Sequence, residues 1–581
     1  MRLWHHFEPR RKRQFVLLLV LTIFTSFAEI FSLGAVLPFL AVLTDPERLF
    51  TNPRIHLLIT AFGITTPKGL ILPFTLAFGV AALVSGGMRL LQIWANVRVS
   101  FATGADLSIS LFRRTLYQPY SVHVSRNSSE IINAVSSKAV KVIFDGIIPA
   151  IGMITSVIML FALMATLIVI APIISLLAFG GVGLIYAIIV FFARGRLKSN
   201  SRLIARESSN VVKLLQEGLG GIRDLLIDGN QAVYCDYYGK SVRPLLRAQG
   251  NNQFTGISPR FGIEATGMII VAALAYWLTG QPDGFARALP ILGAMAIGAQ
   301  RILPVLQQLF REWSFLQGSA ASFKDVLELL DQPLPASLGT GDERALPFRR
   351  EIMMRNLSFR YALESPLVLH NITLGIPKGA RMGIIGATGS GKSTLLDILM
   401  GLLFPTEGVL EVDGVIVNEQ NQRSWQRRIA HVPQAVFLAD SSIAENIAFG
   451  VPKVMINHER VTSAAQQAQI ADLIESWPNK YDTFVGERGI RLSGGQRQRI
   501  GIARALYKRA DVVIFDEATS ALDSETESAV MKSIEELSKD LTILIIAHRL
   551  TTLKGCDTVV ELKNGAIIAN GSYENMVANR N

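Results

Sequence analysis

The sequence predicts a bundle of six membrane-spanning α-helices followed by an α/β domain. Half of the 581 residues are apolar and only 18% are charged, and the mean hydropathy of +0.35 exceeds what a soluble domain usually shows. The excess lies in long apolar runs in the first half of the chain. From about residue 348 the pattern changes to short β-type runs that alternate with helices.

Each apolar run is long enough to cross a hydrocarbon core of roughly 30 Å, which takes about 20 helical residues. Buried helices of a soluble protein are the alternative, but such runs without an alternating polar face would be unusual there. The runs cover residues 15–44, 70–97, 147–170, 172–193, 257–279 and 289–310.

Basic residues predict the orientation of the bundle, because cytoplasmic loops hold an excess of Lys and Arg. Arg10 to Arg13 precede the first run, and the connection between the fourth and fifth runs is rich in Lys and Arg, whereas the next connection holds only Arg287. We therefore expect a multi-pass protein of the cytoplasmic (inner) membrane with both termini and the α/β domain in the cytoplasm. The net charge of +11 then reflects topology and contact with membrane lipids, and nucleic acid is not expected as a partner.

Composition also predicts the domain boundaries. Residues 1–330 form the transmembrane domain, a Pro- and Gly-containing stretch over 331–347 is typical of a linker, and residues 348–581 form the α/β domain. The chain has two cysteines, Cys235 and Cys556, both on the predicted cytoplasmic side. A structural disulfide is therefore not expected.

The first functional motif of the α/β domain is a phosphate-binding loop. The apolar strand 382–385 leads into a segment that fits G-x-x-x-x-G-K-[ST], with a helix after it. Backbone N–H groups of such a loop and the helix amino terminus bind phosphate oxygens, Lys392 reaches the β and γ phosphates, and Ser393 ligates Mg²⁺. The loop consists of Gly386, Ala387, Thr388, Gly389, Ser390, Gly391, Lys392, Ser393 and Thr394.

Two further motifs follow the loop. The apolar strand 511–515 ends in Asp516 and Glu517, as expected where a buried strand delivers acids to a nucleotide: Asp516 for the Mg²⁺ shell and Glu517 to polarise the attacking water. Between these acids and the loop stands the pentapeptide LSGGQ, just before a predicted helix. Its residues Ser493, Gly494, Gly495 and Gln496 can bind an anion at that helix amino terminus.

This combination resembles the ATP-binding cassette (ABC) ATPases, and with six spans ahead of it the chain is similar to ABC exporter half-transporters over nearly its whole length. The resemblance implies ATP and Mg²⁺ as cofactors and a signature that binds ATP held by the opposite subunit. It also implies that Tyr361 stacks on adenine, that Gln434 contacts Mg²⁺, and that His548 contacts the γ phosphate. Because Glu517 and the signature are both intact, a homodimer with two active sites is favoured over a heterodimer.

The exporter resemblance extends to cytoplasmic segments. Residues 483–489 are similar to the exporter loop that contacts the membrane domain, and residues 520–523 would cross the dimer seam. Segments near 118–130 and 227–234 lie where exporters place coupling helices. The resemblance implies ATP-driven export or flipping.

Ionisable residues inside the predicted spans bear on the substrate, since charges there are costly and usually face a cavity or a partner. Ion pairing between the helices is the structural alternative. The three arginines exceed the two acids, and guanidinium groups suit phosphates, so this set of residues favours a substrate with an anionic head group. These residues are Glu29, Arg89, Arg260, Glu264 and Arg301.

The membrane half is similar to bacterial lipid-linked oligosaccharide flippases. The similarity lies in residues 25–39 and 258–264 and in an apolar outer segment at 54–63. The outer segment is predicted to be an interfacial helix or a helix buried under a loop. We expect an amphiphilic substrate, a lipid-linked oligosaccharide or another lipid. A multidrug or general lipid exporter is the alternative. An ATP-gated channel or regulatory membrane protein is disfavoured, because Glu517 is intact and no long regulatory insertion is seen.

Overall fold

The structure, a computed structural model, describes residues 2–44, 46–50, 66–170, 172–279, 284–334, 345–517, 524–535, 540–547 and 550–578. Contacts divide the chain into two compact units. The helical unit contains residues 1–118 and 126–333, and the α/β unit contains residues 119–125 and 334–581. The predicted outer segment 54–63 lies outside the described residues.

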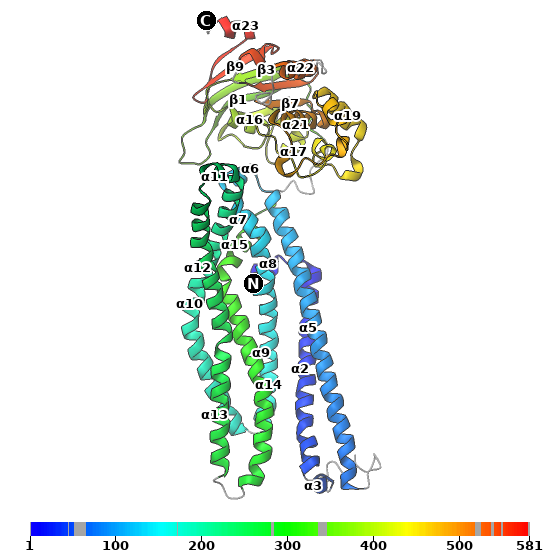
Figure 1. Ribbon diagram of the computed structural model, residues 1–581, viewed down its shortest axis with the longest axis vertical. Coiled ribbons are helices and arrows are strands. Elements are labelled where there is room, and N and C mark those ends of the chain that lie inside the picture. The colour runs from blue at the N-terminus through cyan, green and yellow to red at the C-terminus, as the bar shows by residue number, and fades with distance from the viewer. Residues whose placement is uncertain are drawn as a thin grey trace. The chain divides into compact units, whose positions relative to one another are not determined.

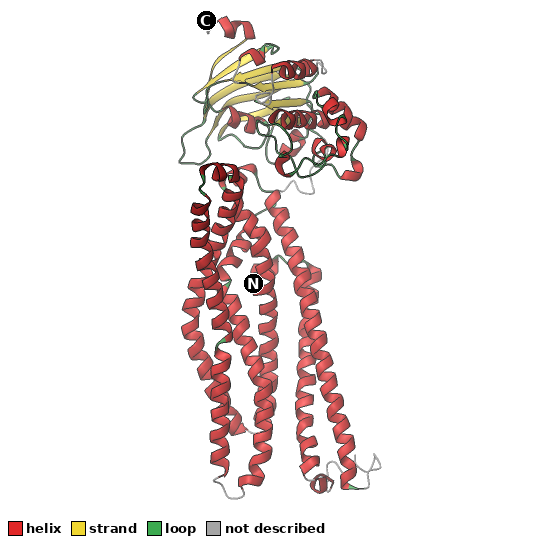
Figure 2. Ribbon diagram, viewed as in Figure 1, coloured by secondary structure: helices red, strands yellow, loops and turns green. Residues whose placement is uncertain are grey.

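Long helices of the helical unit coincide with the predicted apolar runs (Figures 1 and 2). Three stretches of the described helices, Pro9–Val36, Pro67–Leu116 and Ser128–Thr166, are long and apolar enough by themselves to cross a membrane. The prediction of a helical membrane bundle is confirmed. Its long helices are α2 (Pro9–Thr44), α5 (Ile71–Leu116), α9 (Ile148–Ile170), α10 (Pro172–Gly220), α13 (Pro259–Thr279) and α14 (Gly284–Gly318).

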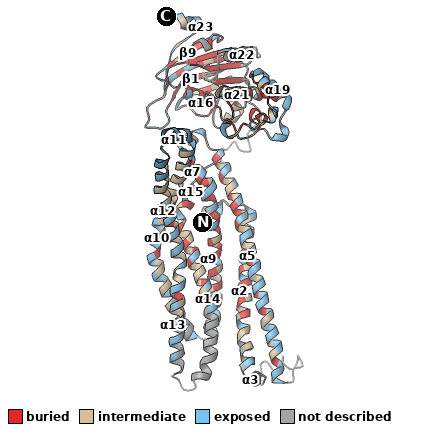
Figure 3. Cartoon of the chain, viewed as in Figure 1, coloured by how far each residue is buried: buried red, intermediate tan, exposed pale blue. Residues whose placement is uncertain are grey.

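The bundle is held by helix pairs. The helix α2 packs against α5 and α9, and α14 packs against α9 and α13. Apolar side chains also cover the outside: Phe31 is 71% exposed and Leu83 is 77% exposed, and exposed positions recur along α5 (Figure 3). Such outward apolar faces are stable where lipid tails replace water.

Several helices continue beyond their apolar runs. The polar parts of α5 and α10, together with α12 (Gln231–Ile257), extend the bundle past the predicted membrane boundary. Two short helices lie near the predicted coupling segments: α6 (Tyr120–Ser125) falls within the first, and α11 (Ile222–Asp228) ends where the second begins. The smaller helices of this unit include α1 (Arg2–His5), α3 (Pro46–Phe50), α7 (Ser128–Asn133), α8 (Ala139–Lys141) and α15 (Ala320–Leu330).

The α/β unit contains two sheets. One is antiparallel, in the order β2-β1-β4-β5, and the other has the order β10-β9-β3-β8-β7-β6 with β10 antiparallel to β9 and the remaining neighbours parallel. The strands are β1 (Glu351–Phe359), β2 (Leu369–Pro377), β3 (Arg381–Ile385), β4 (Glu407–Val412), β5 (Val415–Ile416), β6 (Ile429–Val432), β7 (Val512–Asp516), β8 (Thr542–Ile546), β9 (Thr558–Lys563) and β10 (Ala566–Gly571).

The parallel strands position the functional loops. Parallel strands that are covered on both faces read as continuous apolar runs, and β7 and β8 are buried along almost their whole length. Their carboxyl ends meet at one edge of the sheet, where loops carry ligand-binding groups. The helices of this unit are α16 (Lys392–Leu399), α17 (Gln422–Gln426), α18 (Ile443–Ile447), α19 (His458–Gln467), α20 (Ala471–Glu475), α21 (Gly494–Lys508), α22 (Ser524–Glu535) and α23 (Tyr573–Ala578).

Candidate functional site

The phosphate loop connects β3 to α16. Gly391 has φ +100°, and a Cβ there would lie 2.8 Å from Leu369 Cδ2, so this turn requires glycine. Gly389 has φ +80° and would place a Cβ into open space. The loop backbone is therefore accessible on the side of Gly389, as a phosphate-binding loop requires.

Polar atoms of the loop fit a phosphate. Lys392 Nζ donates to the carbonyl oxygens of Gly386 and Ala387 at 2.8 and 3.1 Å, although the residue is only 7% exposed. The Ser390 hydroxyl is buried and has no hydrogen-bond partner in the described residues. A phosphate oxygen would satisfy this hydroxyl and provide the ammonium group with an anionic partner. Ser393, the predicted Mg²⁺ ligand, lies in the first turn of α16.

Two predicted side chains meet at the edge of the sheet. Gln434 follows β6, Glu517 follows β7, and Gln434 Nε2 donates to Glu517 Oε2 at 2.8 Å. The backbone of Glu517 has φ +50°, which is uncommon for a residue other than glycine, and its N–H bonds to the Ile546 carbonyl at 3.1 Å. The structure thus fixes the direction of the predicted catalytic carboxylate, with Asp516 just before it at the end of β7.

A third carboxylate, Asp397 of α16, lies in the same electrostatic environment. Burial and, to a smaller extent, the charge of Asp516 raise the pKa of Asp397 to about 6. No motif marks this residue in the sequence, and only the packing of α16 near the end of β7 reveals it. Its raised pKa lowers the negative charge beside Asp516 in mildly acidic solution.

Tyr361 lies beside the phosphate loop. Its hydroxyl is 3.1 Å from Thr394 Oγ1, and its ring makes an edge contact with Phe359 at a centroid distance of 5.0 Å. The residue remains 53% exposed, which fits the expected stacking on a base. His548 and residues 520–523 lie outside the described residues.

The signature forms the amino terminus of α21. Ser493 Oγ accepts a hydrogen bond from the Gln496 N–H at 3.2 Å, while the Ser493 N–H donates to Gln496 Oε1 at 2.8 Å. This capping box orders the turn that contains Gly494 and Gly495. The predicted helix start is confirmed, and its N–H groups form a turn suited to an anion.

Arg504, on the same helix, connects the signature to the segment after Gln434. Its guanidinium donates to the carbonyl oxygens of Asn446 and Phe437, each at 2.9 Å, and burial lowers its pKa to about 10. A shift of α21 would therefore displace the chain that follows Gln434. No motif in the sequence predicts this contact.

In the helical unit, the first two predicted substrate residues form an ion pair between helices. Arg89 Nε of α5 lies 3.1 Å from Glu29 Oε1 of α2, and the side chains are 47% and 1% exposed. Nearby, Gln92 Nε2 donates to Thr22 Oγ1 at 3.0 Å. A polar seam therefore crosses the contact between α2 and α5.

The next two predicted residues pair within one helix. Arg260 Nε donates to Glu264 Oε1 at 2.8 Å, and Gln307 Nε2 of α14 donates to the same oxygen at 3.3 Å. Pairing, the structural alternative for these residues, is thus present for Arg89 and Arg260. Arg301 belongs to α14, but its side chain is not among those described.

The fold and the site define a class of protein: a helical membrane domain joined to a phosphate-loop ATPase domain. Comparisons with known proteins identify the family. The family model of the ABC transporter transmembrane region matches residues 15–281, and the ABC transporter family model matches residues 369–520. The chain belongs to the ABC transporter family and is an ABC exporter that hydrolyses ATP.

Two relatives and one solved structure are similar over most of the chain. An ATP-dependent lipid A-core flippase of Chromohalobacter salexigens is 32% identical, with 69% of each chain covered. A Bacillus subtilis protein named provisionally as a multidrug export ATP-binding/permease protein, YgaD, is 31% identical, with 73% of this chain and 72% of the relative covered. A bacterial Atm1-family ABC exporter with ATP bound shares the fold, with a TM-score of 0.78 at 22% identity and 98% and 96% coverage.

Proposed function

We propose that this exporter flips an amphiphile with a phosphate-bearing head group, a lipid-linked oligosaccharide or another anionic lipid, from the cytoplasmic leaflet of the inner membrane. The observation that carries the proposal is the geometry of the two arginine ion pairs. In each pair the shortest contact runs through Nε, 3.1 Å for Arg89 and 2.8 Å for Arg260. A guanidinium group carries five N–H donors, so an arginine that contacts a carboxylate through Nε has further donors to offer a second anion.

Such arginines are suited to phosphate. The buried Glu29 carboxylate orients Arg89 while about half of the arginine side chain stays exposed. A guanidinium fixed on one edge can bind phosphate oxygens with the other, with little loss of side-chain entropy. Charged groups at membrane depth are costly, and in proteins they mark pathways for substrates or ions. The name of the flippase relative, which specifies a lipid, is consistent with this proposal.

For the ATPase cycle, the proposal assigns one role to each predicted residue. Ser393 and Asp516 hold Mg²⁺ with Gln434, Glu517 polarises the attacking water, and His548 contacts the γ phosphate. Tyr361 stacks on adenine.

The signature turn at Ser493 completes the site built on Lys392 of a second copy, so the working unit is a homodimer. Mixing active chains with Glu517→Gln chains should then give mixed dimers of altered activity. ATPase activity proportional to the fraction of active chains, with no mixed dimer found by crosslinking, would contradict this assembly.

The substrate proposal is tested in proteoliposomes with a fluorescent polyprenyl-diphosphate glycan. Alanine at Arg89, Arg260 or Arg301 should reduce flipping and substrate-stimulated ATPase while basal ATPase and assembly persist. Loss of a charge-assisted contact corresponds to about 1.5 to 3 kcal/mol, or about tenfold to hundredfold weaker head-group binding. Arg98→Ala is the matched control, because Arg98 is a neighbouring cation of α5 that contacts the Trp94 ring instead.

The ion pairs allow a second test, which distinguishes a structural role of the arginines from substrate binding. If Arg89 is only a structural partner of Glu29, the single replacement should impair expression and assembly, and joint replacement of both residues should restore them. Undiminished flipping in all arginine variants would refute the proposal. Stimulation of ATPase by hydrophobic drugs and not by the glycan would favour the multidrug alternative, which similarity to the Bacillus subtilis relative supports.

A further inference from the structure

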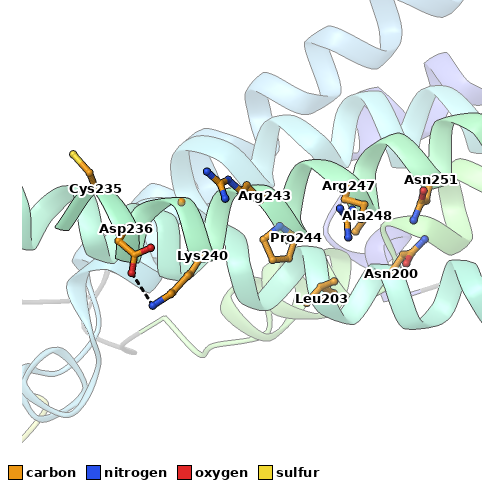
Figure 4. A pocket seen from close by; sticks show the side chains of 11 residues that line it. Asn200, Leu203, Cys235, Asp236, Lys240, Arg243, Pro244, Arg247, Ala248 and Asn251 are labelled. Atoms are coloured by element: carbon orange, nitrogen blue, oxygen red, sulfur yellow. Dashed lines mark ion pairs between the residues drawn. The ribbon is translucent and has the colours of Figure 1, made fainter. Parts of the chain in front are cut away.

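A cavity of about 510 Å³ lies between α10 and α12 in the helical unit. Figure 4 shows its lining, with Asp236 and Lys240 toward one end and Arg247, Asn251 and Asn200 toward the other. Its size falls in the range of ligand pockets, about 300 to 1,000 Å³. None of its residues belongs to the ATP site or to the ionisable residues of the predicted spans.

The cavity has an excess of positive charge. Lys240, Arg243 and Arg247 line it from α12, while its single lining carboxylate, Asp236, pairs with Lys240 at 2.7 Å. Their spacing of three and four residues places the cations on one side of the helix. Across the described ranges, no ion pair is found for Arg243 or Arg247. Two guanidinium groups thus share one cavity without a carboxylate partner.

The wall behind these cations is well packed. Leu245 and Ala248 of α12 are buried against Ile204 of α10, so the two helices hold the cavity lining in place. Pro244 also lines the cavity, and because proline lacks an N–H the helical hydrogen-bond ladder is interrupted there. Orientation of the membrane segment requires basic residues on the cytoplasmic side, but it does not require them to surround a packed cavity.

The cavity lies outside the apolar part of the helices, whereas the arginines proposed to bind substrate belong to the predicted spans. The apolar part of α10 ends near Ala193, and the apolar run that continues into α13 begins near Ile257, at the end of α12. At a rise of 1.5 Å per residue, Asn200 lies about 10 Å and Arg247 about 15 Å beyond these points. The polar head-group layer is roughly 5 to 8 Å thick on each side. The cavity is therefore within reach of an extended head group and open to solutes of the cytoplasm.

We propose that this cavity binds a phosphate or diphosphate group, held by the guanidinium groups of Arg243 and Arg247 with Lys240 as a further cation. Paired arginines bind phosphate oxygens through several charge-assisted hydrogen bonds, and the Asn251 amide supplies a neutral donor. The group belongs to a lipid head or to a soluble phosphate compound. This site is independent of which substrate the exporter flips.

Cys235 provides a local reporter, since its thiol lines the cavity and is exposed whereas Cys556 is buried. The full-length protein is labelled with an environment-sensitive thiol-reactive fluorophore and titrated with inorganic pyrophosphate, and Cys235→Ser verifies the labelled position. We expect a saturable response. Arg243→Gln with Arg247→Gln should raise the apparent Kd by about tenfold or more. Arg223→Gln, which removes an exposed cation of α11 outside the cavity, should leave it unchanged.

Further measurements distinguish binding in this cavity from binding at the ATP site, and a lipid ligand from a soluble one. The response should persist in Lys392→Ala, because a response that came from pyrophosphate at the ATP site would be lost in that variant. A response to pyrophosphate in detergent supports a soluble phosphate ligand, and a response only in nanodiscs with phosphatidic acid, not phosphatidylcholine, supports a lipid head.

The proposal is overturned if neither pyrophosphate in detergent nor phosphatidic acid in nanodiscs produces a response. It is also overturned if the double variant has an unchanged Kd while its thermal unfolding matches that of the parent protein. Failure of Cys235 to label in the assembled protein would show that a second copy covers the cavity, and would also overturn it.

Discussion

Replacing Glu517 by Gln isolates the chemical role of one carboxylate, because the structure shows what the change preserves. Glu517 Oε2 accepts a hydrogen bond from Gln434 Nε2 at 2.8 Å. The glutamine side chain has nearly the same shape, and its amide oxygen can accept the same bond. The substitution therefore removes the basicity of the group while retaining its position at the end of β7.

The magnitude follows from the role of the carboxylate. A positioned general base or water-orienting group contributes about 10² to 10⁴ in rate, which corresponds to about 3 to 5 kcal/mol in the activation barrier. ATP binding should remain close to normal, since the phosphate contacts come from the loop that contains Ser390 and Lys392. ATP-bound dimers should then accumulate.

The assay measures steady-state phosphate release and nucleotide binding on the same purified protein, with the dimer fraction determined by crosslinking. Gln434→Ala is the informative companion, since it removes the hydrogen bond but keeps the carboxylate, and a smaller loss of rate is expected. Hydrolysis by Glu517→Gln near the parent rate would refute the assignment. Loss of ATP binding in that variant would also refute the separation of binding from chemistry.

Three further predictions concern the α/β unit. Lys392→Ala should weaken binding of a fluorescent ATP analogue by about tenfold to hundredfold, because the ammonium group contacts the phosphates; unchanged affinity would contradict this role. Burial and Asp516 raise the pKa of Asp397 to about 6, so its ionisation opposes folding increasingly as pH rises from about 4 to 6. Asp397→Asn should therefore stabilise the metal-free protein by about 1 kcal/mol at pH 7.5, allowing for solvent screening, and by less at pH 5. Thermal unfolding measures the stabilisation, and equal effects at both pH values would contradict the raised pKa of Asp397. Trp425 is fully buried, and its indole N–H bonds to the Leu399 carbonyl at 2.7 Å. Trp425→Ala should cost about 3 to 5 kcal/mol in urea unfolding and Trp425→Phe less, and equal losses would show that the hydrogen bond and not the ring volume dominates.

The parts of the site that follow from local sequence were predictable. The strand, loop and helix around Lys392 follow from glycine positions and apolar periodicity, and the helix after the signature follows from its helix-forming residues. Both are confirmed. The capping box between Ser493 and Gln496 was not predicted, although its two residues lie within four positions. The hydrogen bond between Gln434 and Glu517 joins residues that follow the neighbouring strands β6 and β7. The pairing of these strands sets its geometry, which no short motif encodes.

In the helical unit, too, the sequence predicted local features but not the contacts between distant residues. Hydropathy located the apolar part of each long helix, but it could not show that α5 and α10 continue as polar helices past Val97 and Ala193. It left the partners of Arg89 and Arg260 open, because the rotation of each helix about its axis decides which side chains meet. Asp397 and Arg504 were not foreseen, since their surroundings arise from tertiary packing alone.

Leaflet-resolved transport measures the proposed ATP-dependent flipping of a phosphate-headed amphiphile. Proteoliposomes that contain the parent protein and a fluorescent polyprenyl-diphosphate glycan are given ATP and Mg²⁺, and an impermeant quencher reports the fraction in the outer leaflet. We expect ATP-dependent redistribution that is lost in Glu517→Gln and reduced in Arg89→Ala but retained in Arg98→Ala. Equal redistribution with and without ATP, or none despite active ATP hydrolysis, would contradict it.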